Sequence, residues 1–456
     1  MKSTVTQIVL LGGGYVSIWA YRSLIRKLRH EIDCNRIQIT VICPEKYHFF
    51  HGWTAESLTC IIQDQNRMSP LSGLFAKALI IQACAEKIDA ASKTVLIKMK
   101  DGLSQNIHYD HLLIGFGSFD SECIEGIHRY GYQVKSPEAF NHTKQTIKLL
   151  VEQAVNAEQS LAQKLLSFTI AGGGFTGVEL ATNIAEFITI LKRQYPSLQK
   201  IRPSIRLISA TPRVLSVLQS RFDRLIRYTE KTIKRYDIEV ISNNKVIKVT
   251  EYGAHLSDGS FIQSSMVIST IGQSRMILKG TENMDRDIMN RLYTNSYLQI
   301  QKYSTIWGGG DACHVNNCLR MQACPSNALW AMKHGEHAGR NIAMAIKNKP
   351  LIAFKYKGLG QSASLGIGKG IGELYGIQFT GWIAWVMRFF VFNYFMPYRK
   401  VMFNEISDWL FLLFRRRRIG LHIQKESEKA EEIFDTKQPQ LINLAGTQYP
   451  MKSTSR

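Results

Sequence analysis

Two glycine-rich turns, each between a short apolar run and a helix-like stretch, constrain this chain more than any other feature. Residues 8–11 (IVLL) lead into Gly12-Gly13-Gly14, and residues 168–171 (FTIA) lead into Gly172-Gly173-Gly174. A strand, a tight glycine turn and a helix leave the amides of the helix N-terminus open to a phosphate. Because two such units lie about 160 residues apart, we predict an α/β protein with two Rossmann-like dinucleotide-binding domains.

The first turn departs from the dinucleotide-binding fingerprint in two places. Ser17 stands where the fingerprint has glycine or alanine. Cys43 stands at the end of the next apolar run, where an acidic residue usually binds a ribose hydroxyl. A tight turn without a ligand is the alternative interpretation. The residues of this turn that we expect to contact a nucleotide are Gly12, Gly14, Tyr15 and Val16.

The second turn carries the full G-x-G-x-x-G spacing. The residues that we expect to hold a nucleotide there are Gly172, Gly174, Phe175, Thr176 and Gly177. The acidic residue is absent here too, because the next strand ends at Ser209 and Arg213 follows shortly after it. That combination can tolerate or attract a 2′-phosphate. The sequence therefore leaves the choice between NADH and NADPH open.

A third glycine cluster, YSTIWGGGDACHV, places one carboxylate beside a turn. We expect Asp311 to lie at the start of a helix, where it can hold a chain of sugar-like hydroxyl groups. A plain loop is the alternative when the cluster is considered alone. After two dinucleotide-binding units, the binding interpretation is favoured.

Composition excludes some classes of function. The chain of 456 residues has a formal charge of +21, which suits nucleic acid, an anionic membrane surface or anionic ligands. No zinc-finger spacing, RNA-binding aromatic signature or basic heptad is found, so we expect no nucleic acid partner. The eight cysteines have irregular spacing, and the apolar run at the start is too short for a secretory signal. Both features favour a cytoplasmic body with reduced thiols.

The order of these pieces resembles the two-dinucleotide flavoprotein reductases, and within them the type II NADH:quinone oxidoreductases. GGGFTGVELA, YHFFHGWTAE and QACPSNALWAMKHG match segments of that family, and the likeness runs from residue 5 to about 418. It implies an FAD-binding domain at 1–120 and 300–355, an NAD(P)H-binding domain at 121–299, and a membrane-associating region at 356–418. We expect residues 419–456 to be a mostly disordered tail.

The resemblance also implies an activity. It predicts an NAD(P)H dehydrogenase that passes hydride to FAD and electrons to a membrane quinone, without proton pumping. Glu179 and Lys333 are the expected catalytic residues. A helix-start carboxylate and a solvated charge are their respective alternatives. The further cofactor contacts that the resemblance implies are Ala85, Gly117, Gly272 and Ala328.

Two other functions stay open on the sequence. A sulfide:quinone oxidoreductase would use separated cysteines, for which Cys123 and Cys324 are the candidates. A slow redox sensor or scaffold flavoprotein is the other, because Leu329 and Lys333 replace the polar residues usual near the flavin. A metal site at Cys313, His314 and Cys318 has no convincing second ligand pair, so we predict none.

The apolar segment GWIAWVMRFFVFNYFMPYRK decides how the chain meets a membrane. Its length approaches that of a membrane span, but Arg388 and Asn393 interrupt it and Pro397 closes it. The following stretch has Ile406 and Trp409 at helical spacing, with polar residues expected on the other side. We predict that residues 379–418 lie on the membrane surface, at the cytoplasmic face of the cell membrane. A span, a core helix and a homodimer contact are the alternatives.

Overall fold

The computed structural model describes residues 5–218, 220–319 and 322–414. Met1–Ile419 is one of two compact units of the chain. The other unit, with the expected disordered tail at 419–456, lies outside the described residues.

A five-stranded parallel sheet forms around the first glycine turn, in the order β18-β9-β1-β2-β5. Its strands are β1 (Thr6–Leu11), β2 (Ile37–Ile42), β5 (Leu79–Ile81), β9 (His111–Ile114) and β18 (Ile306–Gly308). The last four residues of β1, Ile8 to Leu11, are apolar and buried, as in a parallel sheet that is covered on both faces. β18 comes from far along the chain and pairs beside β9.

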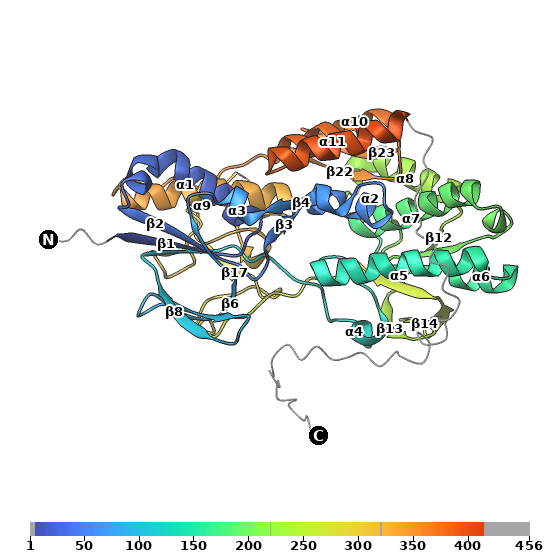
Figure 1. Cartoon of the computed structure of the whole chain (residues 1–456), viewed down its shortest axis with the longest axis horizontal. Coiled ribbons are helices and arrows are strands. Elements are labelled where there is room, and N and C mark those ends of the chain that lie inside the picture. Colours follow the sequence, from blue (N-terminus) through green and yellow to red (C-terminus); the bar gives the residue numbers. More distant parts are fainter. Residues whose placement is uncertain (1–4, 219, 320–321, 415–456) are drawn as a thin grey trace, which may run out of the picture. The chain divides into compact units, whose positions relative to one another are not determined.

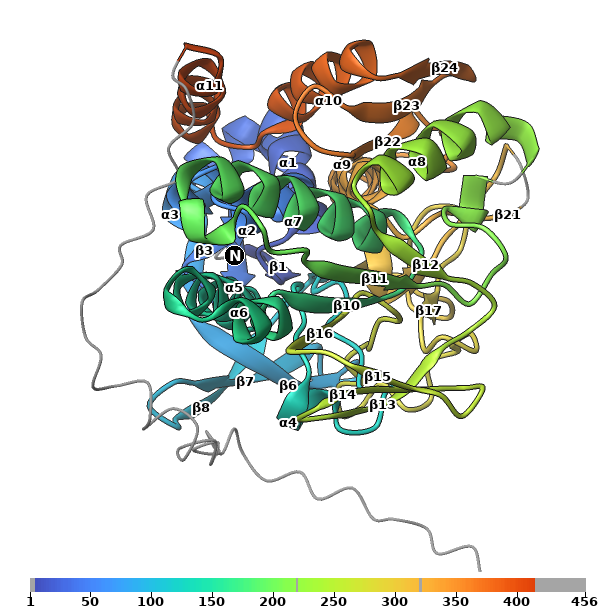
Figure 2. The ribbon, with the colours of Figure 1, turned by 90° about the vertical axis from the view of Figure 1, so that its right-hand side faces the viewer.

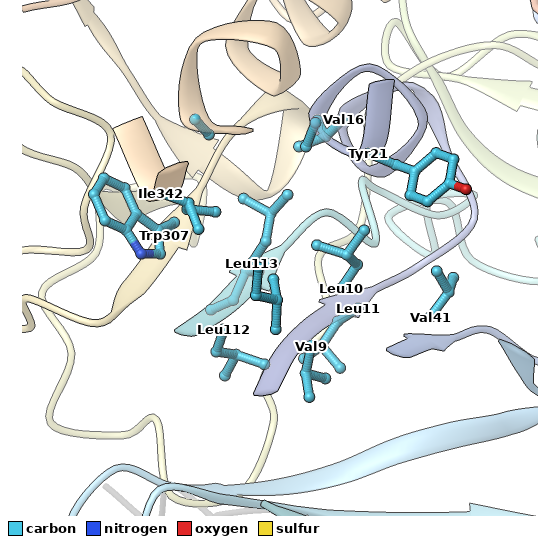
Figure 3. Packing of buried hydrophobic residues seen from close by; sticks show 14 of the residues in the cluster. Val9, Leu10, Leu11, Val16, Tyr21, Val41, Leu112, Leu113, Trp307 and Ile342 are labelled. Atoms are coloured by element: carbon cyan, nitrogen blue, oxygen red, sulfur yellow. The ribbon is translucent and has the colours of Figure 1, made fainter. Parts of the chain in front are cut away.

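Helices and a small sheet cover the two faces of this sheet (Figures 1 and 2). α1 (Tyr15–Asp33) and α9 (Ala328–Ile346) lie on one face, and the antiparallel sheet of β6 (Ala83–Asp89), β7 (Thr94–Met99) and β8 (Ser104–His108) lies on the other. Leu10, Leu113 and Ile342 meet in the core between sheet and helices (Figure 3).

A second parallel sheet forms around the second glycine turn, in the order β12-β11-β10-β16. Its strands are β10 (Ser167–Ala171), β11 (Ser204–Ile208), β12 (Glu239–Ile241) and β16 (Met266–Ser269). α7 (Phe175–Gln194) and α8 (Asp223–Arg235) lie on one side in Figure 2. α5 (Pro137–Asn156), α6 (Gln159–Leu165) and the hairpin sheet β13 (Val246–Thr250), β14 (Gly253–Leu256) and β15 (Phe261–Gln263) lie on the other.

The C-terminal part forms a three-stranded antiparallel sheet and two helices. These are β22 (Gly360–Ser364), β23 (Gly370–Leu374), β24 (Ile377–Thr380), α10 (Trp382–Phe395) and α11 (Arg399–Phe414). Among the described residues, no helix combines the length and apolar character needed to cross a membrane.

Short elements complete the fold. They are β3 (Tyr47–Phe49), β4 (Met68–Pro70), α2 (Thr54–Leu58), α3 (Leu71–Leu74), α4 (Ile127–Tyr130), β17 (Leu292–Tyr293), β19 (Cys313–His314), β20 (Asn316–Asn317) and β21 (Gln322–Ala323). Two expectations are wrong here. No α-helix follows the third glycine cluster directly, because Cys313–His314 pairs with β17 after a single 3₁₀ turn. We also expected no apolar partner layer for the C-terminal segment, yet Trp385 and Trp409 pack in one cluster with Trp53.

Candidate functional site

The first glycine turn joins β1 to α1 and leaves the helix N-terminus open. Gly14 is the N-cap of α1 and supplies no side-chain cap, so the first amides of Tyr15 and Val16 stay available to a phosphate. Gly12 has φ +98°, and a Cβ there would lie 2.8 Å from the Cα of Phe116. Only glycine fits this position, as the fingerprint predicts.

Buried polar groups beside this turn fit a bound dinucleotide. The ring of His48 packs edge-on against that of Tyr15, with 4.6 Å between centroids. Among the described residues, the Nε2 of His48 has no hydrogen-bond partner although it is buried. Burial lowers the pKa of His48 to about 3, so the ring is neutral. An unsatisfied buried nitrogen is costly, and a ligand oxygen would satisfy it.

The third glycine cluster brings Asp311 to the same end of the first sheet. Its carboxylate accepts a hydrogen bond from the Ser118 hydroxyl at 2.7 Å and one from the Lys135 amine at 3.4 Å. Burial lowers the pKa of Lys135, and Asp311 opposes that shift. His334 of α9 accepts a hydrogen bond from the Gly310 amide at 3.0 Å and so fixes the turn. The carboxylate is thus held in place, as a group that binds hydroxyls must be.

The second glycine turn repeats this geometry between β10 and α7. Gly174 is the N-cap without a side-chain cap, and Phe175 and Thr176 begin the helix. A Cβ on Gly177 would lie 1.8 Å from the carbonyl oxygen of Gly172, which forbids any other residue there. The five expected residues are therefore gathered at one phosphate-sized turn.

We expected Glu179 two residues into the helix, but it is the fifth residue of α7 because that helix begins at Phe175, and it contacts the C-terminal elements. Its Oε1 accepts a hydrogen bond from the Ser364 amide at 2.8 Å and one from the Arg388 guanidinium at 3.1 Å. Arg388 also pairs with Glu56 at 2.6 Å and donates to the Gly52 carbonyl at 2.7 Å. Glu179 is therefore more than a helix-start carboxylate, because it belongs to a buried ion cluster.

The protonation state of Glu179 depends on the other members of this cluster. Burial raises the pKa of Glu179 to about 7, Arg388 opposes that rise and Glu56 adds to it. A carboxyl group that titrates near neutral pH can give or take a proton during turnover. Arg388 also lies 4.7 Å from the ring centroid of Trp53 and 4.4 Å from that of Phe392, so its charge is enclosed by aromatic faces.

Sequence reasoning missed the ion cluster in which Arg388 pairs with both Glu179 and Glu56. Arg388 was visible as the lone charge in an apolar segment, which pointed away from a membrane span but not toward an ion pair. Glu56 lies in the segment YHFFHGWTAE and gave no signal of its own. Arg388 is 209 positions from Glu179 and 332 positions from Glu56 in the sequence, so no local sequence pattern indicates either pair.

Lys333, the other expected catalytic residue, lies in a different setting. Its amine pairs with Glu336 one helical turn along α9 at 2.9 Å, and its side chain is 37% exposed. Tyr356 lies 5.9 Å away as a cation–π partner. These contacts favour the solvated-charge interpretation, and its catalytic role stays a prediction.

The remaining expected cofactor contacts are spread over four elements. Gly117 follows β9, and Gly272 follows β16, so both lie after strands of the two parallel sheets. Ala328 is the first residue of α9, whose N-cap Asn327 accepts a hydrogen bond from the Trp330 amide at 3.1 Å. Ala85 lies in β6, outside both parallel sheets. Their contacts with a cofactor stay predictions.

All eight cysteines are free thiols. Cys123 is exposed and Cys324 is buried, and burial raises the pKa of Cys324 to about 12. Within the described ranges, no group of three or more His, Cys, Asp or Glu side chains could hold a metal ion. Because all eight thiols are free, the part of the chain that the structure describes contains no redox-active disulfide.

Known proteins show where this architecture occurs. A family model described as pyridine nucleotide-disulphide oxidoreductase matches residues 6–335. A type II NADH:quinone oxidoreductase from Staphylococcus haemolyticus is 25% identical over 396 residues, which are 84% of this chain and 93% of the relative. The corresponding protein of Staphylococcus aureus is 24% identical over 393 residues, with the same coverage.

Solved structures share the fold. NDH2 from Plasmodium falciparum, in complex with NADH, has a TM-score of 0.79 at 15% identity and covers 91% of this chain and 99% of its own. The sulfide:quinone oxidoreductase of Aquifex aeolicus has a TM-score of 0.68 at 17% identity and covers 91% and 96%. The predicted fold class of two dinucleotide-binding domains is confirmed.

These matches also confirm the expected resemblance to type II NADH:quinone oxidoreductases, the oxidoreductase class, and FAD with NADH as cofactors. The two open glycine turns, the unsatisfied His48 nitrogen and the fixed Asp311 carboxylate are what such cofactors require. The chain belongs to the pyridine nucleotide-disulphide oxidoreductase family.

Proposed function

We propose that this protein is a membrane-surface NADH dehydrogenase that reduces a quinone through FAD and pumps no protons. The curated relatives that cover most of the chain carry the name type II NADH:quinone oxidoreductase. In the domain division that we propose, residues 1–120 and 300–355 bind FAD and residues 121–299 bind the pyridine nucleotide.

One observation carries the proposal. Glu179, on the helix that follows the second glycine turn, is tied by Arg388 to the two-helix C-terminal region. A nucleotide-binding helix and an apolar surface segment are thereby joined through one buried ion cluster. This arrangement places the nucleotide-binding helix beside the apolar surface segment, which suits an enzyme that takes electrons from a soluble carrier and delivers them to a lipid-soluble acceptor.

The protein's own groups have defined tasks in this mechanism. Bound FAD would supply the two-electron chemistry between the nicotinamide and the acceptor. The amides at Gly174 and Phe175 bind the pyrophosphate of the pyridine nucleotide, and Asp311 orients hydroxyl groups. Glu179, with its pKa raised to about 7, holds or releases the proton that quinone reduction consumes.

The membrane surface in this proposal is the outer side of α10 and α11. Six large side chains of these helices are exposed: Trp382, Ile383, Phe390, Tyr394, Phe403 and Leu410. Three polar residues of these helices, Arg388, Asn393 and Glu405, are buried instead. This reverses the pattern of an ordinary surface helix. We expected Trp409 and Glu405 on opposite sides of α11, and that expectation is wrong because both are buried.

That reversal supports a helix pair that lies in the membrane interface. Asp408 accepts hydrogen bonds from the Gln63 amide at 3.1 Å and from Asn66 at 2.6 Å. Arg399 and Lys400 are exposed at the start of α11, where they can meet anionic lipid headgroups. We propose the cytoplasmic face of the cell membrane as the location.

The test is quinone-dependent turnover. Purified protein in detergent should consume NADH when a short-chain quinone is present and should show little NADH consumption without it. Sulfide in place of NADH should give no quinone reduction. Sulfide-driven turnover that thiol reagents abolish would overturn the proposal in favour of the sulfide:quinone alternative.

A further inference from the structure

The loop that follows β11 lies against the second glycine turn. The Leu215 amide donates a hydrogen bond to the Gly173 carbonyl at 2.7 Å. A Cβ on Gly173 would lie 2.5 Å from the Ser209 hydroxyl. The end of the second strand of such a unit is where the adenosine ribose of a dinucleotide binds. Residues 209–215 therefore border the place where a 2′-phosphate distinguishes NADPH from NADH.

This loop lacks the acidic residue that usually selects NADH. Ser209 takes that place, and its hydroxyl lies 3.1 Å from that of Thr211. Arg213 is the single cation of the SATPRVL segment. In dinucleotide-binding folds, a strand that ends without an acidic residue and is followed by an arginine generally accommodates the 2′-phosphate of NADPH.

The structure shows that Arg213 is already occupied. Its Nε and one terminal nitrogen form a two-pronged pair with Glu230 of α8 at 2.8 and 2.7 Å. Its other terminal nitrogen donates to Asp223 at 2.5 Å. Arg227 also pairs with Asp223 at 3.1 Å, so the four charges cancel. Charge-assisted pairs of this geometry leave Arg213 few free donors for a phosphate.

A hollow of about 340 Å³ adjoins these groups, within the size range of small-molecule sites. Arg213, Glu230 and Ser242 are among its lining residues. Ser242 follows β12, so the hollow lies at the carboxyl ends of the parallel strands, where such sheets bind ligands. A 2′-phosphate placed there would meet the Glu230 and Asp237 carboxylates and a neutralised Arg213, with the Lys234 amine as the other cation of the lining.

We propose that Glu230 and Asp223 make this protein select NADH over NADPH by holding Arg213 away from the 2′-phosphate. The selection device lies on α8 and not at the strand end, where the fingerprint has it. The proposal rests on the proposed binding of a pyridine nucleotide at the Gly172–Gly177 turn.

The test compares the wild type with Asp223→Asn/Glu230→Gln. Anaerobic flavin bleaching is followed with NADH and with NADPH, and binding of adenosine 5′-monophosphate and adenosine 2′,5′-bisphosphate is measured by calorimetry. A freed arginine that gains a phosphate contact should improve NADPH use and bisphosphate binding about tenfold or more. NADH use should change by less than about threefold, since NADH has no 2′-phosphate to contact.

Two further variants keep the outcome specific. Adding Arg213→Ala to the double variant should abolish the gain. Glu239→Gln is the matched control. It breaks the pair between Glu239 of β12 and Arg206 of β11, which has a similar length of 2.9 Å, and should leave the ratio of NADPH use to NADH use unchanged. An unchanged ratio in the double variant, or equal use of both coenzymes by the wild type, would overturn the proposal. Failure of NADH to bleach the flavin would instead reject the proposed function. Binding of the two adenosine phosphates would still test whether Glu230 and Asp223 hold Arg213 away from a 2′-phosphate.

Discussion

Replacing Glu405 by glutamine should make the protein more stable in mildly alkaline solution. Glu405 of α11 is fully buried, and its Oε1 accepts hydrogen bonds from Asn393 at 3.3 Å and from Trp409 at 3.2 Å. Its Oε2 has no hydrogen-bond partner among the described residues. Burial raises the pKa of Glu405 from 4.5 to about 8. The carboxyl group is therefore neutral in the folded protein at neutral pH.

The sign of the pH effect follows from that raised pKa. Unfolding exposes the group and lets it ionise, so its contribution to stability is complete below about pH 4.5 and is lost as pH rises toward 8. At about 1.4 kcal/mol for each pKa unit, the loss between about pH 5.5 and 8.5 is roughly 3 kcal/mol. With an unfolding entropy of about 2.1 cal/mol/K per residue over roughly 400 residues, this corresponds to about 3 to 4 °C.

The assay is thermal unfolding of wild type and Glu405→Gln at both pH values. Glutamine cannot ionise, so the difference in melting temperature should grow by about 3 to 4 °C in its favour from the lower to the higher pH. Glu251 is exposed, so Glu251→Gln serves as the control. Its melting temperature should differ from that of the wild type by the same amount at both pH values. A melting difference for Glu405→Gln that does not depend on pH would refute the reasoning.

Three further predictions concern the ion cluster and the membrane surface. Arg388→Met removes the cation that Glu56 and Glu179 share and should lower the free energy of unfolding by about 3 to 5 kcal/mol. The loss would be measured as a lower melting temperature and weaker flavin retention. An unchanged melting temperature would argue against the cluster. Glu179→Gln should remove a step near pH 7 from the pH dependence of quinone reduction, and a step that persists belongs to another group. Replacing Trp382, Phe390 and Tyr394 by serine should release the protein from liposomes, since each of these side chains contributes roughly 1.5 to 3 kcal/mol when buried. High salt alone should not release the wild type, and its release by salt would contradict this prediction.

The structure also changes how the membrane region is best tested. Truncation near residue 378 would remove Arg388 from Glu56 and Glu179 and uncover the Trp53 side of the apolar cluster. Such a truncation would disturb the fold as well as membrane binding. Substitutions confined to exposed side chains separate the two effects.

Local signals in the sequence predicted the two sheets and both glycine turns. Glycine spacing reports backbone geometry directly, because Gly12 and Gly177 stand where a Cβ has no room. The apolar runs before them became β1 and β10 with bounds within two residues of the expected ones. Such features depend on neighbours in sequence, so a single chain reveals them.

The parts that were missed depend on contacts between distant segments. The Arg388 pairs and the occupied Arg213 need the third dimension, because each partner has an ordinary alternative as a surface charge. Helical spacing placed the polar residues of α11 opposite Trp409, yet Trp409 donates a hydrogen bond to Glu405 and Asp408 also contacts the protein. Helical spacing identifies two faces of a helix but does not say which one meets a membrane.

The central claim is that reducing equivalents pass from a soluble nicotinamide to a flavin held by this chain. The most direct measurement is the visible absorption of purified protein, mixed with NADH without oxygen and then with a soluble quinone. The account predicts a yellow protein that bleaches with NADH and recovers its colour with the quinone. A colourless protein, or a yellow one whose spectrum NADH leaves unchanged, would contradict it.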